Sequence, residues 1–454
     1  MMSRETLLRK YDVPVPRYTS YPTVPYWETD RFNTTRWGDL VRQELGQSND
    51  SQGISLYIHL PFCESLCTYC ACNTRITRNH AVESRYSEAV LAEWDSYLRI
   101  FGNTPVVREL HIGGGTPTFF SPENLGRLVE GILSRCRVHE DRAFSFEGHP
   151  NNTTGEHLRV LHALGFDRVS FGVQDLDMKV QQAIHRIQSY ESLARITELS
   201  RQTGYRSISY DLIYGLPHQT VASVEHTMDK VCALKPDRLA FYSYAHVPWI
   251  RPGQRGYEDA HLPSDVLKRE LYERGDLLLR EHGYSSIGMD HYALPGDDLH
   301  VAHEAGRLHR NFMGYTTTRT RLLIGLGASA ISDAYSAYAQ NVKGVEEYEA
   351  LAKRGELPLL KGHIQSEHDR ITRRCILDIA CRGVLDGGHM GAVCDDQMLN
   401  TLRTMESEGI VALEADGLRV TEMGQAFVRN ICSVFDVRMR DQLTKKEAGF
   451  SRGI

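Results

Sequence analysis

Residues 54–72 read ISLYIHLPFCESLCTYCAC, and this stretch decides the fold. Its first part, residues 54–62, is apolar and β-branched and predicts a buried strand. Cys63, Cys67 and Cys70 follow in a C-x3-C-x2-C pattern on the loop after this strand, where three thiolates can converge on one centre. Three thiolates are one ligand short of a closed four-coordinate site.

Two kinds of metal centre fit this loop. A 4Fe-4S cluster held by three thiolates leaves one iron open to an exogenous ligand, whereas a structural zinc site closes its shell with a fourth Cys or His. Cys72 and His59 could supply that fourth ligand, so zinc remains an alternative. The common zinc pattern pairs two C-x2-C halves, and because the sequence has no second half we favour the cluster.

Strand and helix patterns alternate on both sides of this loop. β-branched or aromatic runs predict strands at 54–62, 106–112, 143–147, 168–173, 207–214 and 238–247. Amphipathic stretches separate them at 84–100, 121–135, 156–164, 190–203 and 221–234, as in consecutive βα units. The fold class is therefore α/β, with residues 51–290 forming an incomplete parallel (β/α)6 barrel. Periodicity alone leaves a doubly wound sheet as the alternative.

Two further regions flank the predicted barrel. Residues 1–50 hold few periodic runs and several prolines, so we expect an extended N-terminal arm that packs on another part of the chain. Residues 291–365 are predicted to connect the barrel with the C-terminal region and to complete the active-site face.

Residues 366–454 are predicted to form a mostly helical, winged-helix-like domain. Helical patterns at 369–382 and 396–408 precede two alternating runs at 410–415 and 418–421, and another helical pattern starts at Met423. Asp416-Gly417 joins the two runs and predicts a type I′ hairpin. We interpret the domain as a packing or lid module. DNA binding is the minor alternative, because the region has no basic stripe.

Composition excludes several classes of function. The 454 residues carry 52 basic and 58 acidic side chains, a net charge of −6, so no overall positive field attracts nucleic acid or anionic lipid. The first 17 residues lack the apolar core of a signal peptide, and no run of 18 apolar residues follows, so we expect a cytoplasmic protein with no membrane partner. Ten cysteines are too few for a disulfide scaffold.

Small and polar residues recur near the carboxyl ends of the predicted strands. Gly113-Gly114-Gly115 end the second strand and Glu147 ends the third, while Gln174, Asp211 and Ala245 lie at or near the ends of later strands. In a parallel barrel these ends share one face. Each residue alone fits a capping or loop-bonding role, and the glycine run alone fits a turn, but their common placement with the cysteines favours a ligand site.

The sequence resembles the oxygen-independent coproporphyrinogen III oxidases, or coproporphyrinogen dehydrogenases, a family within the radical S-adenosylmethionine (SAM) superfamily. The C-x3-C-x2-C loop is similar to the signature of the superfamily, and the resemblance covers nearly the whole chain. The segments that carry it are PRYTSYPT at 16–23, the segment 57–72, GVQD at 172–175, DLIYGLP at 211–217, GMDH at 288–291, LHRNF at 308–312 and FSR at 450–452.

This resemblance implies an activity and its cofactors. The family decarboxylates two propionate groups of coproporphyrinogen III to vinyl groups and so forms protoporphyrinogen IX, an anaerobic step of haem synthesis. It implies a 4Fe-4S cluster on Cys63, Cys67 and Cys70 and two SAM molecules, with Cys72 matching a family cysteine that is not a ligand. An unidentified low-potential electron donor is implied, and we expect a monomer.

The resemblance also assigns site residues. Tyr57, Gly113, Glu147, Ala245 and Ile331 would contact the cluster-bound SAM, and Tyr69, Gly114, Gly115, Gln174, Arg186 and Asp211 would surround the second. Tyr57 and Glu147 are also expected to take part in catalysis. The four carboxylates of the substrate require cationic partners, and Arg17, His309 and Arg310 are the candidates. Their alternative roles are solvated surface charges and an ordinary loop histidine.

Two departures from the family and two rival functions stay open. After Glu147 the chain reads GHPNN at 148–152, where relatives carry a second acid before the proline, and VPWIR at 247–251 is less familiar. One rival is a haem chaperone of the same superfamily, a branch that typically lacks both Cys72 and the 16–22 segment. The other is a radical SAM tetrapyrrole methyltransferase.

Overall fold

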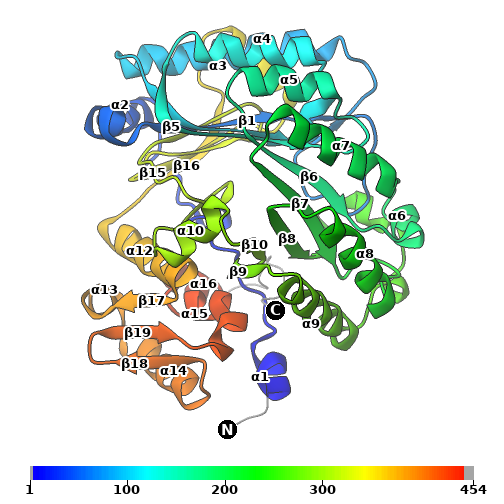
Figure 1. Ribbon diagram of the computed structural model, residues 1–454. Coiled ribbons are helices and arrows are strands. Elements are labelled where there is room, and N and C mark those ends of the chain that lie inside the picture. Colours follow the sequence, from blue (N-terminus) through cyan, green and yellow to red (C-terminus); the bar gives the residue numbers. More distant parts are fainter. Residues whose placement is uncertain (1–3, 444–454) are drawn as a thin grey trace. The chain divides into compact units, whose positions relative to one another are not determined.

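The structure of this protein is a computed structural model, and it describes residues 4–443 (Figure 1). The motif at 450–452 lies outside these residues. Contacts divide the chain into two compact units, which we call the sheet unit (29–284 and 318–364) and the terminal unit (up to 28, 285–317 and from 365 onward). The region 291–365, expected to be one connecting segment, is thus shared between the two units.

Six parallel strands form the centre of the sheet unit. They are β1 (Ile54–Leu60), β4 (Val106–Gly114), β5 (Arg137–Gly148), β6 (Arg168–Gln174), β7 (Ser207–Tyr214) and β8 (Arg238–Ser243), and each pairs with the next. A strand order that follows the sequence is that of a barrel, whereas a doubly wound sheet reverses its order at a switch point. The six predicted strands are confirmed, and the doubly wound alternative is wrong.

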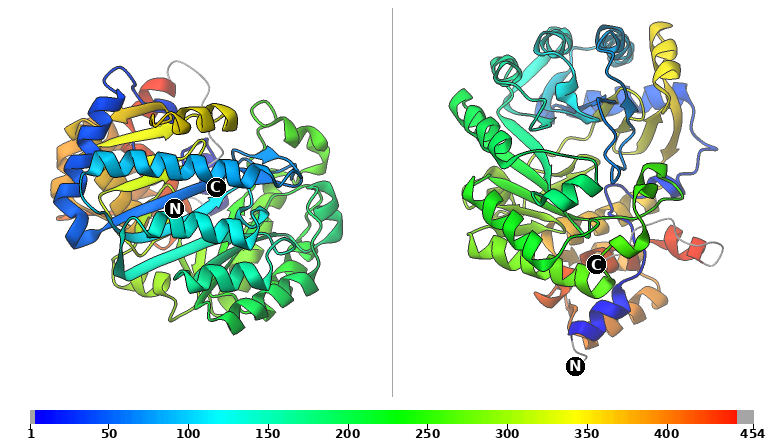
Figure 2. Two further views of the ribbon diagram at one scale, coloured as in Figure 1. Left: turned by 90° about the horizontal axis from the view of Figure 1, so that it is seen from above. Right: turned by 90° about the vertical axis from the view of Figure 1, so that its right-hand side faces the viewer.

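Helices cover the outer side of these strands (Figures 1 and 2). The five that follow the predicted patterns are α3 (Val82–Phe101), α4 (Pro122–Leu133), α5 (Gly155–Ala163), α7 (Tyr190–Thr203) and α8 (Val221–Ala233). Capping side chains set the starts of the last four, since Ser121, Thr154, Ser189 and Thr220 each accept a hydrogen bond from the backbone N–H three residues on. Two further helices, the short α6 (Met178–Ala183) and the longer α9 (Asp265–Glu281), were not predicted. No helix within residues 4–443 is long and apolar enough to cross a membrane.

The expectation of an extended arm over residues 1–50 is wrong for its second part. Residues Thr34–Gln52 form α2, a helix of 19 residues that starts at the Asn33 cap. It buries Trp37, Val41 and Leu45, which recur every fourth residue and form a narrow apolar stripe among polar residues and glycines. That stripe holds one large side chain per turn, so the helical period is weak in the sequence.

Additional strands extend the sheet beyond β1. β13 (Leu323–Leu326) pairs in parallel with β1, so β1 has no free edge for β8 and the six strands do not close. β14 (Ile331–Asp333), β15 (Ala337–Asn341) and β16 (Leu359–Ile364) continue antiparallel, with α11 (Val345–Lys353) before the last. The loop that carries Cys63, Cys67 and Cys70 is called the cysteine loop below. The short parallel pair β2 (Phe62–Cys63) and β3 (Arg75–Ile76) closes its base.

The C-terminal region of the terminal unit contains the predicted helices and hairpin. Its elements are α12 (Glu367–Arg382), β17 (Val384–Asp386), α13 (Gly387–Val393), α14 (Asp396–Ser407), β18 (Val411–Glu414), β19 (Gly417–Val420), α15 (Val428–Val434) and α16 (Val437–Leu443). The hairpin is confirmed, but its turn is not type I′. Glu414 pairs with Gly417, so Ala415 and Asp416 are the central residues, and neither has the positive φ that type I′ needs.

The remaining elements of the terminal unit are short. They are α1 (Arg4–Tyr11), β9 (Ser285–Gly288), β10 (His291–Ala293), α10 (Asp298–Glu304), β11 (His309–Asn311) and β12 (Gly314–Thr316). The expected packing of the N-terminal residues on another part of the chain is confirmed here, because Tyr18 and Tyr21 lie in one hydrophobic core with Ile376, Leu402 and other residues of the C-terminal region.

One glycine joins the added strands to the end of β1. Gly327, just after β13, has φ +103°, and a Cβ there would lie 2.5 Å from the backbone oxygen of His59. Its N–H donates to the buried Glu93 carboxylate at 2.9 Å. The close approach and the left-handed backbone both require glycine at this position.

Gly327→Ala should therefore lower the free energy of unfolding by about 2 kcal/mol or more, from the left-handed conformation and the contact with His59 together. Gly46→Ala is the matched control, because this exposed position in α2 has nothing within 4 Å of an added Cβ. Urea unfolding measures both. Equal midpoints for the two variants would contradict the assignment.

Candidate active site at the carboxyl ends of the parallel strands

The cysteine loop lies at the end of β1 and carries three partly exposed free thiols. Cys63 Sγ is 3.4 Å from Thr116 Oγ1, and a guanidinium nitrogen of Arg186 is 3.7 Å from Cys67 Sγ. The backbone N–H of Cys72 donates to Cys70 Sγ at 3.4 Å. The predicted ligands are therefore on one loop, beside a cationic side chain.

The donor set fits an iron–sulfur cluster. A hydrogen bond from Cys72, together with the charges of Arg186 and Arg251, lowers the pKa of Cys70 to about 6, which favours the thiolate that binds iron. Burial raises the pKa of Cys63 to about 11, a cost that metal binding overcomes by displacing the proton. In residues 4–443 no group of three such side chains is arranged around a single ion. A 4Fe-4S cluster binds each thiolate at a different iron, so its ligands are spread more widely.

The glycine run at the end of β4 makes room for protein groups. A Cβ on Gly113 would lie 2.7 Å from a Glu147 carboxylate oxygen, and one on Gly114 would lie 2.8 Å from the His59 ring. A Cβ on Gly115 would lie 2.7 Å from the Pro61 carbonyl carbon. The run therefore lets β4 approach Glu147 and the start of the cysteine loop, in addition to the ligand approach predicted from the sequence.

His111 on β4 lies between Tyr57 on β1 and Glu147 on β5 and contacts both side chains. The tyrosine is also held by His59. His59 Nε2 donates to the Asn73 carbonyl at 2.9 Å, so its Nδ1 accepts from the Tyr57 hydroxyl at 3.0 Å. The Tyr57 ring stacks on His111 at a centroid distance of 5.9 Å, and His111 Nε2 is 3.3 Å from a Glu147 oxygen. The sequence analysis missed His111. Its position two residues before Gly113, on the same face of β4, was the available signal.

Gln174 ends β6, Asp211 lies within β7, and Arg186 follows α6 and reaches back to β6. Asp211 accepts a hydrogen bond from Ser170 at 3.1 Å, and burial, followed by the nearby charge of Glu147, raises the pKa of Asp211 to about 7. Arg186 donates to the carbonyl of Gly172, the residue paired with Asp211, at 2.6 Å. Gln174 ends β6 with a left-handed φ of 66°.

The remaining predicted cofactor residues are placed mainly by their backbones. Gln254 Nε2 lies 3.3 Å from the carbonyl of Tyr69 and 3.1 Å from that of Ala245, and so joins the cysteine loop to the end of β8. Ile331 on β14 packs its backbone against Gly325, which pairs with Tyr57. All eleven predicted cofactor residues are thus in the sheet unit.

The three candidates for substrate binding are in the terminal unit, together with one another. Arg17 forms an ion pair of 3.1 Å with Asp290, and Arg310 donates to the Arg17 carbonyl at 3.3 Å. Arg310 is 5% exposed, its guanidinium lies 4.5 Å over the Tyr315 ring, and its Nε and Nη1 have no hydrogen-bond partner within residues 4–443. A solvated surface charge is therefore the wrong description of Arg310. His309 precedes it on β11.

The two segments that depart from the family pattern, 148–152 and 247–251, differ in how their side chains are placed. His149 Nδ1 accepts from the Asn151 N–H at 3.1 Å, and burial with the nearby Arg186 lowers the pKa of His149 to about 3, so the imidazole is neutral. Trp249 in the second departure is 71% exposed. A neutral imidazole near Arg186 leaves the guanidinium charge available for a ligand.

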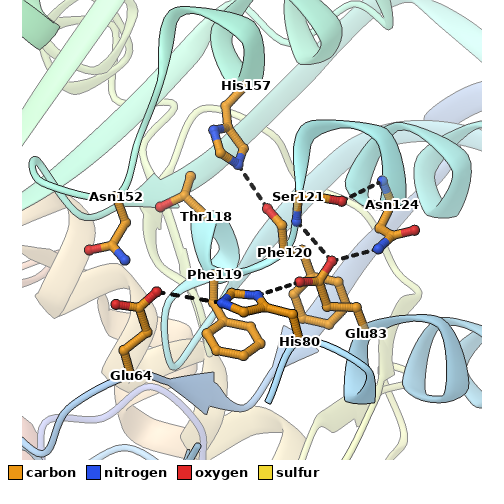
Figure 3. Close-up of a pocket in the computed structure, with 10 residues that line it drawn as sticks. All are labelled: Glu64, His80, Glu83, Thr118, Phe119, Phe120, Ser121, Asn124, Asn152 and His157. Carbon is orange, nitrogen blue, oxygen red and sulfur yellow. Dashed lines mark hydrogen bonds and ion pairs between the residues drawn. The ribbon is translucent and has the colours of Figure 1, made fainter. Parts of the chain in front are cut away.

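A pocket of about 470 Å³ lies beside the cysteine loop (Figure 3). His80 stacks on Phe119, with a centroid distance of 4.4 Å, and pairs with Glu83 at 2.6 Å. The other Glu83 oxygen accepts from Ser121 and Asn124 at the start of α4. Glu83 therefore caps the helix start and is already satisfied, so we assign the pocket no part in the chemistry.

The raised pKa of Asp211 gives a test with a definite sign. The folded protein holds this proton more tightly than the unfolded chain, so the contribution of Asp211 to stability falls as pH rises from about 4 to about 7. Asp211→Asn should therefore gain stability over wild type, by roughly 2–3 kcal/mol, between pH 5 and pH 8. Urea unfolding at both pH values measures this gain. A gain that is absent, or shared by the exposed control Asp229→Asn, would contradict it.

Comparisons with known proteins identify the family. Residues 57–231 match the radical SAM superfamily. Oxygen-independent coproporphyrinogen III oxidases from Pseudomonas aeruginosa (37% identical, covering 95% of both chains) and Synechocystis sp. (36% identical, covering 99% of this chain and 97% of the relative) match almost end to end. The solved structure of coproporphyrinogen III oxidase from Escherichia coli, a radical SAM enzyme, superposes with a TM-score of 0.87 at 35% identity, covering 95% of this chain and 98% of the other. This chain belongs to the oxygen-independent coproporphyrinogen III oxidase family.

Proposed function

We propose that this protein converts coproporphyrinogen III to protoporphyrinogen IX without oxygen, by oxidative decarboxylation of two propionate groups to vinyl groups. The observation that carries the proposal is similarity to oxidases of this name over at least 95% of the chain, together with three free thiols near two inward-facing carboxylates. Each propionate loses a β-hydrogen atom and carbon dioxide and gives one electron to an acceptor. The chemistry needs no side chain as a general base.

The cofactors would occupy the carboxyl ends of the strands. Cys63, Cys67 and Cys70 would hold a 4Fe-4S cluster that, when bound, supplies the electron for reductive cleavage of SAM to a radical that abstracts hydrogen. Two SAM molecules are proposed, as in the family. Glu147 would accept hydrogen bonds from the ammonium group of the first.

The second SAM would meet a different set of groups. Arg186 offers a guanidinium to a carboxylate, with an Nε that has no partner within the described structure. Asp211 would bind ribose hydroxyls, either as carboxylate or, because its pKa is about 7, as the neutral acid. These groups would bind and orient the second SAM.

Arg310, Arg17 and His309 would bind the substrate carboxylates. Two nitrogens of the buried Arg310 guanidinium have no partner in the described part of the chain, and a buried cation of this kind is costly unless an anion pairs with it. We further propose a monomer that takes electrons from a low-potential donor. The ten free cysteines support the reducing cytoplasm as its location.

An anaerobic assay tests the proposed function. Protein reconstituted with iron and sulfide, reduced and given SAM and coproporphyrinogen III, should yield a product that mass spectrometry finds two carboxyl groups lighter. Cys67→Ala should lose the visible absorbance of the cluster and SAM cleavage, because two thiolates rarely retain the centre, whereas Cys136→Ala should keep both. A gain of a methyl group would indicate a methyltransferase, and tight haem binding without turnover a chaperone.

Substitution of Arg310 tests the substrate contact separately. Arg310→Met should raise KM for coproporphyrinogen III by roughly tenfold or more, because a charge-assisted hydrogen bond to a carboxylate is lost. SAM cleavage without substrate should be unchanged, and the variant should be at least as stable as wild type, since a buried charge with no counter-ion among the described residues is removed. Arg403→Met, exposed on α14, is the control. An unchanged KM for Arg310→Met would contradict the assignment.

A further inference from the structure

Three side chains on two neighbouring strands form a continuous hydrogen-bonded row. His111 on β4 lies between Ser145 and Glu147 on β5, with its Nδ1 2.8 Å from Ser145 Oγ and its Nε2 3.3 Å from Glu147 Oε1. The strand register places His111 directly opposite Ser145. The row therefore depends on the parallel pairing of β4 and β5 and on no flexible loop.

The chemistry of the row sets the direction of each bond. A carboxylate can only accept, so His111 Nε2 carries the hydrogen that points to Glu147. In a neutral imidazole Nδ1 is then the acceptor, and the Ser145 hydroxyl donates to it. Glu147 thus selects the tautomer in which His111 donates to the carboxylate, and the Ser145 hydroxyl, which can donate or accept, holds the other ring nitrogen.

Glu147 needs such a partner because burial alone does not fix the orientation of its carboxylate. Its side chain is 43% exposed, and its other oxygen accepts a hydrogen bond of 3.2 Å from the Gly114 N–H. With His111 and Gly114 in place, each carboxylate oxygen has one donor from β4 and keeps lone pairs for a ligand. The Tyr57 ring, stacked at 15° to the imidazole plane, restricts rotation of His111.

We propose that His111 is a positioning residue: its Nε2–H orients the Glu147 carboxylate toward the ammonium group of a bound SAM, and Ser145 fixes the imidazole that does so. This inference rests on the proposed function, because it takes Glu147 as a SAM-binding group. The hydrogen bonds of His111 go to Ser145 and Glu147, so it acts on the site through Glu147.

Calorimetric titration of SAM into the cluster-loaded protein tests the role of His111 without any turnover. His111→Leu should weaken SAM binding roughly tenfold, the loss of one charge-assisted hydrogen bond at a partly exposed site. His111→Gln, whose amide can donate from nearly the same place, should recover most of the affinity. Ser145→Ala should give an intermediate loss. His226→Leu, exposed on α8, is the matched control and should bind as wild type does.

A double-mutant cycle separates positioning from packing. In a Glu147→Gln background, His111→Leu should change SAM affinity less than twofold, because the group on which His111 acts is already altered. An equal loss in both backgrounds, or affinity within twofold of wild type for His111→Leu alone, would overturn the inference. Failure of the wild-type protein to bind SAM at all would instead overturn the proposed function. The iron content and the thermal unfolding of each variant establish that the cluster and the fold are retained. If His111→Leu does not fold, the SAM affinity of Ser145→Ala tests the inference in its place.

Discussion

The close contact between the ends of β1 and β4 is the constraint on which the site depends. Leu60 pairs with Gly114, and the next N–H, on Gly115, donates to the Leu60 carbonyl at 2.8 Å. Side chains at these glycines would collide with His59 and the Pro61 backbone. Because β4 ends without side chains, the cysteine loop can turn over it and bring its thiols next to the groups on the neighbouring strands.

The charged side chains at this site differ in their electrostatic surroundings. Glu147 and Asp211 are close enough for the charge of one to raise the pKa of the other. Glu147 has two hydrogen-bond donors from β4, whereas Asp211 has one from Ser170 and is more deeply desolvated, which raises its pKa. Arg186 lies between these carboxyl groups and the thiols and supplies the positive charge that a net acidic chain must place locally.

Much of the fold was predictable because the parallel strands are apolar runs separated by amphipathic helices, and β7 has the predicted limits. The sequence did not reveal α2, whose apolar stripe is narrow, or the strands of three to six residues from β13 to β17, which carry too few residues for a period. Glycines and carboxylates at strand ends marked the site. The role of His111 could not be predicted from the sequence, because it depends on neighbours on another strand. The burial of Arg310 could not be predicted either, because no sequence pattern indicates it.

The terminal unit joins the two ends of the chain in one core, where Tyr11, Tyr18 and Tyr21 pack among residues from 375 onward. Arg429 and Asn430 donate to backbone carbonyls of residues 11–16. On the ribosome, the first segment therefore waits for partners that are made roughly 340 residues later, a delay of roughly 20–70 s at ordinary elongation rates. Its tyrosines stay exposed to solvent or chaperones during that time, and a chain released early would never cover them.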